Sequence, residues 1–187
     1  RINEILQTEV QVKDSDHPNH LSQPVKGVVE FRDVSFRYPG ADADVLEHVS
    51  FVARPGQTTA FIGSTGSGKS TLINLIPRFH DVSEGSITLD GVDIRDLPQK
   101  ELRDAIGYVP QKGLLLRGTV ESNLRYGNPN ASQDTIDTSA RIAQASEFIS
   151  HLDQGMQTPI SQGGTNVSGG QRQRLSICLL YTSPSPR

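Results

Sequence analysis

Residues 63–70 read GSTGSGKS and match the full pattern G-x-x-x-x-G-K-[S/T]. The stretch follows a short apolar run, TTAFI at 58–62, and precedes a segment whose apolar residues have helical spacing. Glycines allow the backbone to curl so that successive N–H groups point inward, while Lys69 and Ser70 add a positive charge and a hydroxyl. We therefore expect this loop to bind a chain of phosphate groups, at the junction of a central strand and its following helix. The alternative is a glycine- and serine-rich turn that matches the pattern by chance.

The segment after the loop predicts a helix with one apolar face. Leu72, Leu75, Ile76 and Phe79 follow the i, i+3, i+4, i+7 spacing, whereas Pro77 predicts a kink or an early end. The run at 58–62 does not alternate, which is typical of a strand buried on both faces of a parallel sheet.

Other segments predict further strands and helices, and the mixture indicates an α/β fold. Strands are expected at 28–38, 45–52 and 106–109, with a hairpin at 86–95 around Asp90-Gly91. Helices are expected at 119–124, 132–145 and 147–152, and another after the glycine-rich segment 161–170.

Composition excludes several classes of protein. The 187 residues suit one domain, or one domain with appendages. With 21 acidic and 18 basic residues, the chain has no bulk positive charge for nucleic acid, so we expect no nucleic-acid partner. The longest apolar run has about five residues, whereas a bilayer span needs about 20. The single cysteine excludes an internal disulfide framework and fits a reducing compartment.

The two ends of the chain differ in pattern from its middle. Apolar residues in 1–13 have nearly helical spacing, and residues 14–24 read as a linker with two prolines, so the folded part is expected to start near Val25. Because the chain opens at Arg1, we interpret it as part of a longer protein. Residues 178–187 end in prolines and serines and are interpreted as a non-native tail, the alternative being a disordered natural tail.

A second glycine-containing loop reduces the number of protein families that the sequence could belong to. Residues 167–174 read VSGGQRQR; alone, this stretch favours an ordinary helix-capping turn. The phosphate loop, YVPQ at 108–111 and VSGGQRQR occur in an order and spacing that resemble the nucleotide-binding domain of ATP-binding cassette (ABC) transporters over about residues 28–177. The stretches GTVESNLRYG and QGGTNVSGGQRQRLSI resemble the exporter branch, multidrug exporters most of all, in which membrane helices and ATPase share one polypeptide.

This resemblance implies a fold and a domain organisation. The fold would be a P-loop NTPase (RecA-like) core with an antiparallel β subdomain and a helical subdomain at about 113–177, and the C-terminal half of the core would be missing. Residues 1–24 would be the end of a membrane-domain helix and a linker, and residues 25–177 a partial nucleotide-binding domain.

The resemblance also assigns roles to individual residues. Tyr38 would stack on adenine, Lys69, Ser70 and Thr71 would bind phosphate and Mg²⁺, and Gln111 would reach Mg²⁺ and the attacking water. The alternatives are an ordinary strand-end tyrosine and a surface glutamine. The implied catalytic residues are Gln111 and Lys69, and the implied metal ligands are Ser70 and Gln111. The implied nucleotide-binding set is Tyr38, Gly63, Ser64, Thr65, Gly66, Ser67, Gly68, Lys69, Ser70, Thr71, Ser168, Gly169, Gly170 and Gln171.

The implied ligands and partners follow from the same family. ATP with Mg²⁺ would be bound between the phosphate loop of one subunit and the VSGGQ loop of another, in a head-to-tail homo- or heterodimer. The other partner would be the protein's own transmembrane domain, at the cytoplasmic face of the cell membrane. The resemblance does not identify the transported substrate.

Two catalytic features of the family do not occur among the 187 residues. These are an apolar strand that ends in Asp-Glu after the VSGGQ helix, and a later histidine that contacts the γ-phosphate. We therefore expect the parent protein to be an ATPase that drives export, and these residues alone to bind nucleotide without hydrolysing it. Two alternatives are a non-transport ABC ATPase and a nucleotide-dependent interaction module without catalysis.

Overall fold

The computed structural model describes residues 10–182, which belong to two compact units, Arg1–Ala105 and Ile106–Arg187. The helical spacing noted within residues 1–9 therefore lies outside the described residues. Within the described range, no helix has both the length and the apolar character that a bilayer span requires.

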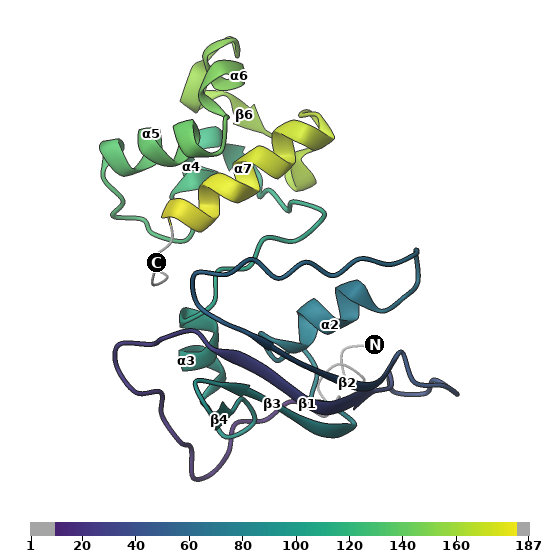
Figure 1. The fold of residues 1–187 in the computed structure, drawn as a ribbon. Helices are drawn as coiled ribbons and strands as arrows, with labels where there is room; N and C mark the ends of the chain where they lie inside the picture. Colours follow the sequence, from purple (N-terminus) through teal and green to yellow (C-terminus); the bar gives the residue numbers. More distant parts are fainter. Residues whose placement is uncertain (1–9, 183–187) are drawn as a thin grey trace. The chain divides into compact units, whose positions relative to one another are not determined.

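The first unit is built on a four-stranded antiparallel sheet with the order β2-β1-β3-β4 (Figure 1). The strands are β1 (Val29–Phe36), β2 (Leu46–Ala53), β3 (Glu84–Leu89) and β4 (Val92–Asp93). Phe31 of β1 lies opposite Phe51 and Ile87, and it is 1% exposed. The predicted strands at 28–38 and 45–52 and the hairpin around Asp90-Gly91 are confirmed.

Two short helices accompany this sheet, α2 (Lys69–Leu75) and α3 (Gln99–Asp104), and Figure 1 shows α2 beside it. The helix α2 begins at Lys69, within the phosphate loop at 63–70. It ends at Leu75 with Ile76 as its C-cap, so the early end predicted from Pro77 is confirmed. The most deeply buried apolar side chains of the unit come from the sheet, both helices and their connections: Phe31, Val34, Phe36, Leu75, Ile87, Ile94, Leu97 and Leu102.

Two predicted strands do not form. Residues 58–62 and 106–109 have no strand assignment, and the Ile62 side chain is 96% exposed. A strand exists only when a neighbour accepts and donates its ladder hydrogen bonds, and none of the strands among residues 10–182 pairs with either segment. The expectation that a central strand precedes the phosphate loop is therefore wrong for this structure, whereas the helix after the loop is confirmed.

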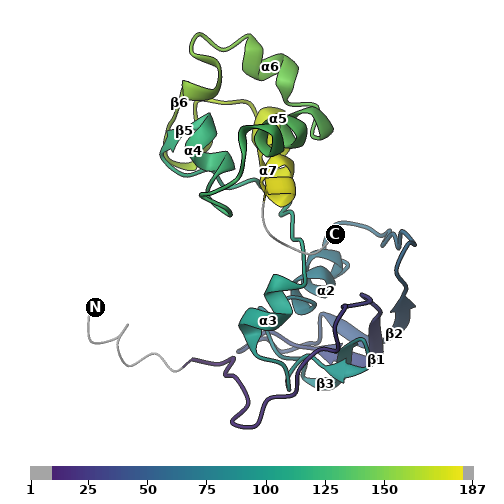
Figure 2. The same ribbon diagram turned by 90° about the vertical axis from the view of Figure 1, so that its left-hand side faces the viewer.

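The second unit is mainly helical, with a two-stranded sheet of β5 and β6. Its longest helix, α7, lies beside α4 and α5 (Figure 2). A single apolar cluster forms its core and includes Leu124, Ile136, Leu175 and Cys178. The elements are β5 (Gly118–Thr119), α4 (Val120–Leu124), α5 (Gln133–Ile142), α6 (Ser146–Ser150), η1 (Gly155–Gln157), β6 (Pro159–Ile160), η2 (Gln162–Gly164) and α7 (Gly169–Thr182).

Side-chain caps explain where α4 and α5 begin. Thr119 and Ser122 form a reciprocal capping box at α4, and the Ser132 hydroxyl accepts the Thr135 N–H at α5. The helix α7 continues to Thr182, and the Cys178 side chain within it is fully buried. The prolines and serines at 183–187, on which the interpretation of a non-native tail rests, lie outside the described residues.

Candidate nucleotide-binding site

The phosphate loop is closed by its own lysine. The Lys69 ammonium donates to the carbonyl oxygens of Gly63 at 2.8 Å and Ser64 at 2.6 Å, and to the Ser67 hydroxyl at 3.1 Å. The ammonium therefore has three bonding partners within the loop, and its charge can pair with an anion that takes the place of one of them. Lys69 itself is half-buried, whereas the loop residues 63–67 are exposed.

Three glycines are needed for this loop conformation. Gly66 and Gly68 have φ of +87° and +81°, a region that residues with a Cβ rarely adopt. A Cβ on Gly68 would lie 2.9 Å from the Val45 carbonyl oxygen, and one on Gly63 would lie 2.6 Å from the Ser67 hydroxyl. The loop is thus shaped by constraints within the first unit.

Tyr38 lies beside the first turn of α2. Its hydroxyl is 3.0 Å from the Thr71 hydroxyl, and Thr71 is 7% exposed. The Tyr38 ring also makes edge-on contacts with Phe36 at 4.8 Å and His80 at 5.3 Å between ring centroids. The structure therefore brings the predicted adenine-stacking residue to the helix that follows the phosphate loop.

The contacts of Thr71 and His80 with Tyr38 were not foreseen from the sequence. They join residues 33 and 42 positions apart, so no local spacing pattern could have indicated them. The Thr71 hydroxyl, for which the resemblance implies contact with phosphate or Mg²⁺, lies beside the Tyr38 hydroxyl.

The predicted metal ligands come from different units. Ser70 is exposed in the first turn of α2, and Gln111 is exposed in the second unit, in the irregular segment after Pro110. Residues 10–182 contain no group of three or more His, Cys, Asp or Glu side chains that could hold a metal ion. Mg²⁺ prefers oxygen ligands and often takes most of them from substrate phosphates and water, so the Ser70 hydroxyl fits an ion that is bound together with a nucleotide.

The VSGGQ loop is the N-terminal cap of α7. The Ser168 N–H donates to the Gln171 side-chain oxygen at 2.8 Å, and the Gln171 N–H donates to the Ser168 hydroxyl at 3.2 Å. This reciprocal pair is a capping box, so the helix-capping interpretation describes the geometry correctly.

Gly169 and Gly170 are exposed, and neither is required by the second unit itself. A Cβ built on either glycine would meet no atom within 4 Å, and neither residue has positive φ. Both lie in the first turn of a 14-residue helix, where backbone N–H groups have no partner within the helix. This geometry allows an anionic group to approach the backbone closely.

The segment before this loop is fixed by polar contacts that the sequence did not reveal. The Arg172 guanidinium donates to the Gly164 carbonyl at 3.0 Å, and the Asn166 side chain donates to the Pro159 carbonyl at 2.8 Å. The Ser161 N–H in turn donates to Asn166 Oδ1 at 2.9 Å. These bonds connect the loop to β6 and hold it at the start of α7.

The sequence of the chain is similar to those of ABC transporter proteins. A family model described as ABC transporter matches residues 46–186. An uncharacterized ABC transporter ATP-binding protein of Mycobacterium tuberculosis is 47% identical over 180 residues, which cover 95% of this chain and 31% of that protein. An ATP-dependent lipid A-core flippase of Pseudomonas aeruginosa is 42% identical, covering 94% of this chain and 29% of that protein.

A solved structure of an ABC exporter also matches the fold of this chain. The structure of a bacterial Atm1-family ABC exporter with ATP bound matches with a TM-score of 0.90 and 35% identity, covering 97% of this chain and 32% of that chain. The chain therefore spans about a third of the length of the relatives it matches.

Proposed function

The chain belongs to the ABC transporter family, and we propose that it is the ATP-binding part of an exporter that couples ATP binding and hydrolysis to the movement of a substrate across a membrane. The observation that carries the proposal is the loop at 63–70, in which Lys69 donates to the carbonyl oxygens of Gly63 and Ser64 and two glycines, Gly66 and Gly68, have positive φ. The exporter branch is supported by the likeness to a lipid A-core flippase and to an Atm1-family exporter.

The predicted site residues of the first unit have the following proposed roles. Lys69 pairs with the β- and γ-phosphates, and the backbone N–H groups of residues 63–68 surround them. Ser70 provides one oxygen ligand to a Mg²⁺ that the nucleotide carries, and Thr71 lies beside the phosphates. Tyr38 stacks on the base, an interaction that every base can make because each has a π-face.

The VSGGQ loop has its proposed role on the nucleotide of another subunit. Two glycines that the second unit does not require leave space for a phosphate group from outside the chain. ATP would then lie in the interface of a head-to-tail homo- or heterodimer, and its binding would favour the closed state by its higher affinity for that state. Gln111 would reach Mg²⁺ and the attacking water in that assembly.

Hydrolysis is proposed for the whole protein and not for these 187 residues by themselves. The chain contains neither the Asp-Glu pair after an apolar strand nor the later histidine that the family uses. The whole protein would act at the cytoplasmic face of the cell membrane, joined to its own transmembrane domain and without a nucleic-acid partner.

Equilibrium binding of Mg-ATP to the 187-residue chain tests the proposal. Lys69→Ala should lower the affinity by about 10- to 100-fold, because it removes a charge-assisted hydrogen bond to phosphate. Lys26→Ala, a change at another exposed lysine of the first unit, should leave the affinity unchanged. Equal affinities of the two variants would contradict the proposed site. Phosphate release above background by the purified chain would contradict the proposal that these residues alone do not hydrolyse ATP.

A further inference from the structure

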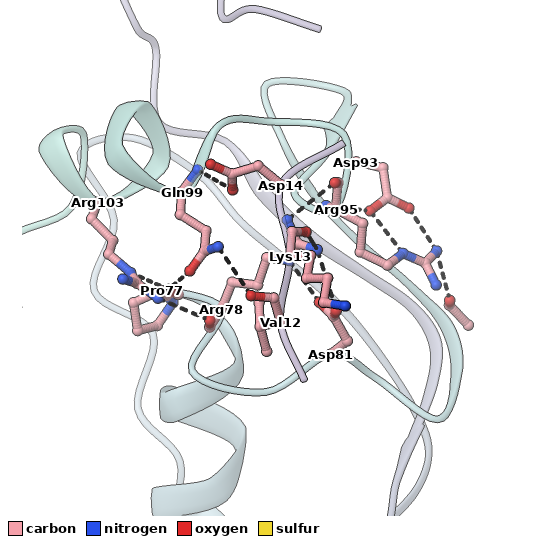
Figure 3. Close-up of polar contacts among 11 residues, drawn as sticks. Val12, Lys13, Asp14, Pro77, Arg78, Asp81, Asp93, Arg95, Gln99 and Arg103 are labelled. Carbon is pink, nitrogen blue, oxygen red and sulfur yellow. Dashed lines mark hydrogen bonds and ion pairs between the residues drawn. The ribbon is translucent and has the colours of Figure 1, made fainter. Parts of the chain in front are cut away.

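The segment that reads as a linker is docked on the first unit. The Lys13 carbonyl oxygen accepts a hydrogen bond from Arg78 Nη2 at 3.0 Å, and the Val12 carbonyl accepts one from Gln99 Nε2 at 3.3 Å. The Asp14 carboxylate accepts the Gln99 N–H at 3.0 Å (Figure 3). Three successive residues of an irregular segment therefore bind to the turn after α2 and to the start of α3.

The same segment is fixed again further along. The Asn19 N–H donates to the Asp96 carbonyl at 2.8 Å, and the Leu21 N–H donates to Glu101 Oε1 at 2.8 Å. The Leu21 side chain is 6% exposed, and His20 Nδ1 lies 2.7 Å from Glu101 Oε2. We call residues 12–21 the strap, because polar contacts hold both of its ends.

Arg78 is the residue through which the strap reaches α2. It is 3% exposed, and its guanidinium bonds to both Asp81 carboxylate oxygens, at 2.6 and 3.2 Å, and to the Arg95 carbonyl at 3.1 Å. The Lys13 carbonyl provides a further acceptor, so release of the strap leaves one N–H of a buried cation without that partner. The Arg78 backbone has φ of +54°, an unfavourable region that persists only where surrounding contacts fix it.

The turn that contains Arg78 is also bonded to α3. Arg103 donates to the Pro77 carbonyl and to the Arg78 carbonyl, each at 3.2 Å, and to the Gln99 side-chain oxygen at 2.9 Å. Gln99 therefore contacts both the strap and Arg103. The strap, the turn and α3 form one hydrogen-bonded network at the C-terminal end of α2, as Figure 3 shows.

We propose that Arg78 is a positioning residue that couples the strap to the phosphate loop, so that strap docking and nucleotide binding favour each other. This inference rests on the proposed function, because it concerns the same nucleotide site. The helix α2 spans about 10 Å, with Lys69 at its start and the Arg78 turn just beyond its end. When the strap is released, the Arg78 side chain loses one of the hydrogen bonds that hold the turn after α2, and α2, which positions Lys69, is held less firmly. Coupling of this kind is reciprocal, so nucleotide must stabilise the docked strap by the factor by which the strap strengthens nucleotide binding.

Hydrogen exchange on the 187-residue chain tests the reciprocal effect without a mutation. The amides of Asn19 and Leu21 report docking directly, since each donates to the folded unit. Saturating Mg-ATP should slow their exchange by about 5-fold, the lower end of common coupling strengths. Unchanged exchange in a sample that demonstrably binds Mg-ATP would overturn the coupling alone, whereas failure to bind Mg-ATP would overturn the proposed function as well.

A pair of variants on α3 tests the converse effect. Glu101→Ala removes the acceptor of the Leu21 N–H, and it should speed exchange at Leu21 and weaken Mg-ATP binding by about 5-fold. Lys100→Ala is the matched control, because its side chain is exposed and its ion pair is with Asp104. Faster exchange at Leu21 with unaltered Mg-ATP affinity in Glu101→Ala would overturn the proposal.

The conservative change Arg78→Lys separates positioning from simple stability. Lysine keeps the charge beside Asp81 but lacks the planar fork that reaches Asp81, Arg95 and Lys13 together. We expect the variant to fold and to bind Mg-ATP about 5-fold more weakly, with exchange at Asn19 no longer slowed by nucleotide. A variant that retains the nucleotide-dependent slowing would contradict a role for Arg78 in the coupling.

Discussion

Glycines have different surroundings in the two units. In the first unit, the backbone conformation and close neighbours of the loop at 63–68 require three glycines. In the second unit, Gly169 and Gly170 are the first residues of α7, and no neighbouring atoms restrict them. Gly66 and Gly68 have positive φ, and a Cβ on Gly63 or Gly68 would collide with atoms of the same unit. A Cβ on Gly169 or Gly170 would meet no atom.

This difference separates a loop whose shape is required by its own unit from one whose glycines are not required by the packing around them. In the first loop, Lys69 is held by hydrogen bonds within the loop. For the second loop, the role proposed above is contact with a nucleotide that another subunit holds. Substitutions in the two loops should therefore have different consequences.

The largest expected effect comes from Gly68→Ala. The added Cβ would lie 2.8 Å from a Leu46 methyl group and 2.9 Å from the Val45 carbonyl oxygen, so the loop must move. We expect a loss of more than about 1 kcal/mol in stability and about 100-fold in Mg-ATP affinity, since small displacements of binding groups have large effects. Urea denaturation and equilibrium nucleotide binding measure the two losses.

The matched change in the other loop is Gly169→Ala. Because this Cβ meets nothing, stability should change by less than about 1 kcal/mol and Mg-ATP affinity of the isolated chain should not change. If Gly169→Ala weakened Mg-ATP binding as much as Gly68→Ala does, the distinction between the loops would be wrong.

The second prediction concerns the base. Tyr38→Ala should lower Mg-ATP affinity by about 5- to 150-fold, the equivalent of about 1–3 kcal/mol of stacking. Tyr38→Phe keeps the ring and loses only the hydroxyl contact with Thr71, so its effect should be about 5-fold or less. Titration with a fluorescent ATP analogue measures both, with urea denaturation as the control for folding. An unchanged affinity in Tyr38→Ala would mean that this residue is only a strand-end tyrosine.

The third prediction concerns stability of the second unit. Ser168→Ala removes the hydroxyl that accepts the Gln171 N–H, and loss of such a cap costs about 1 kcal/mol. Mg-ATP affinity of the isolated chain should stay the same, because the loop is proposed to act on a nucleotide of another subunit. Ser168→Thr, which retains a hydroxyl, should restore most of the stability measured by urea denaturation. A fall in the chain's own Mg-ATP affinity would contradict the assignment of this loop to a partner.

The smallest predicted effect is that acid weakens the docking of the strap on α3, whereas α7 should not respond to acid. The Gln99 N–H lowers the pKa of Asp14 from its ordinary 3.8, and the hydrogen bonds from His20 and then from the Leu21 N–H lower the pKa of Glu101 from its ordinary 4.5. Because both pKa values are lower in the folded chain, the contribution of these carboxylates to strap docking is present above about pH 5 and is lost as the pH falls below about 4.

Hydrogen exchange between pH 7 and 3, corrected for the intrinsic pH dependence of exchange, measures this response. Exchange at the Leu21 amide should become faster below about pH 4. The amide of Cys178 in α7 should not respond, since this residue lies in an apolar cluster. If the Leu21 and Cys178 amides responded equally to acid, the strap carboxylates would not stabilise strap docking.

Local patterns predicted much of the fold. Pro77 ended α2, and Asp90-Gly91 formed the hairpin. Of the predicted apolar face, Leu72 and Leu75 are in the core, whereas Phe79 lies beyond the end of the helix and is exposed. In each case a few neighbouring residues determine the backbone, so the sequence contains the information. The capping turn at Ser168 was foreseen for the same reason.

The errors and omissions depend on contacts between residues far apart in sequence. Residues 58–62 have the composition of a buried strand, but a strand forms only beside a partner, and no strand of the described residues pairs with them. The docking of Asp14 on Gln99 and of Lys13 on Arg78 joins positions more than 60 residues apart. No periodicity or motif signals such contacts, so a polar segment with two prolines looked like a free linker.

The roles predicted for Tyr38 and Gln111 were not based on local sequence patterns. They came from resemblance to a family and not from local physics, because a tyrosine at a strand end or a glutamine after a strand has no distinctive pattern. The structure adds the contact between Tyr38 and Thr71 to this resemblance.

The most direct test of the central claim is a titration of the ¹⁵N-labelled 187-residue chain with Mg-ATP, followed by the backbone amide resonances. If the loop at 63–70 binds the phosphates, the amide signals of Gly63, Gly66, Gly68 and Lys69 should shift most and saturate together. In Lys69→Ala, the shifts of the loop amides should saturate only at about 10- to 100-fold higher Mg-ATP concentration. Saturable shifts confined to residues outside this loop, or no shifts from a folded sample, would contradict the account.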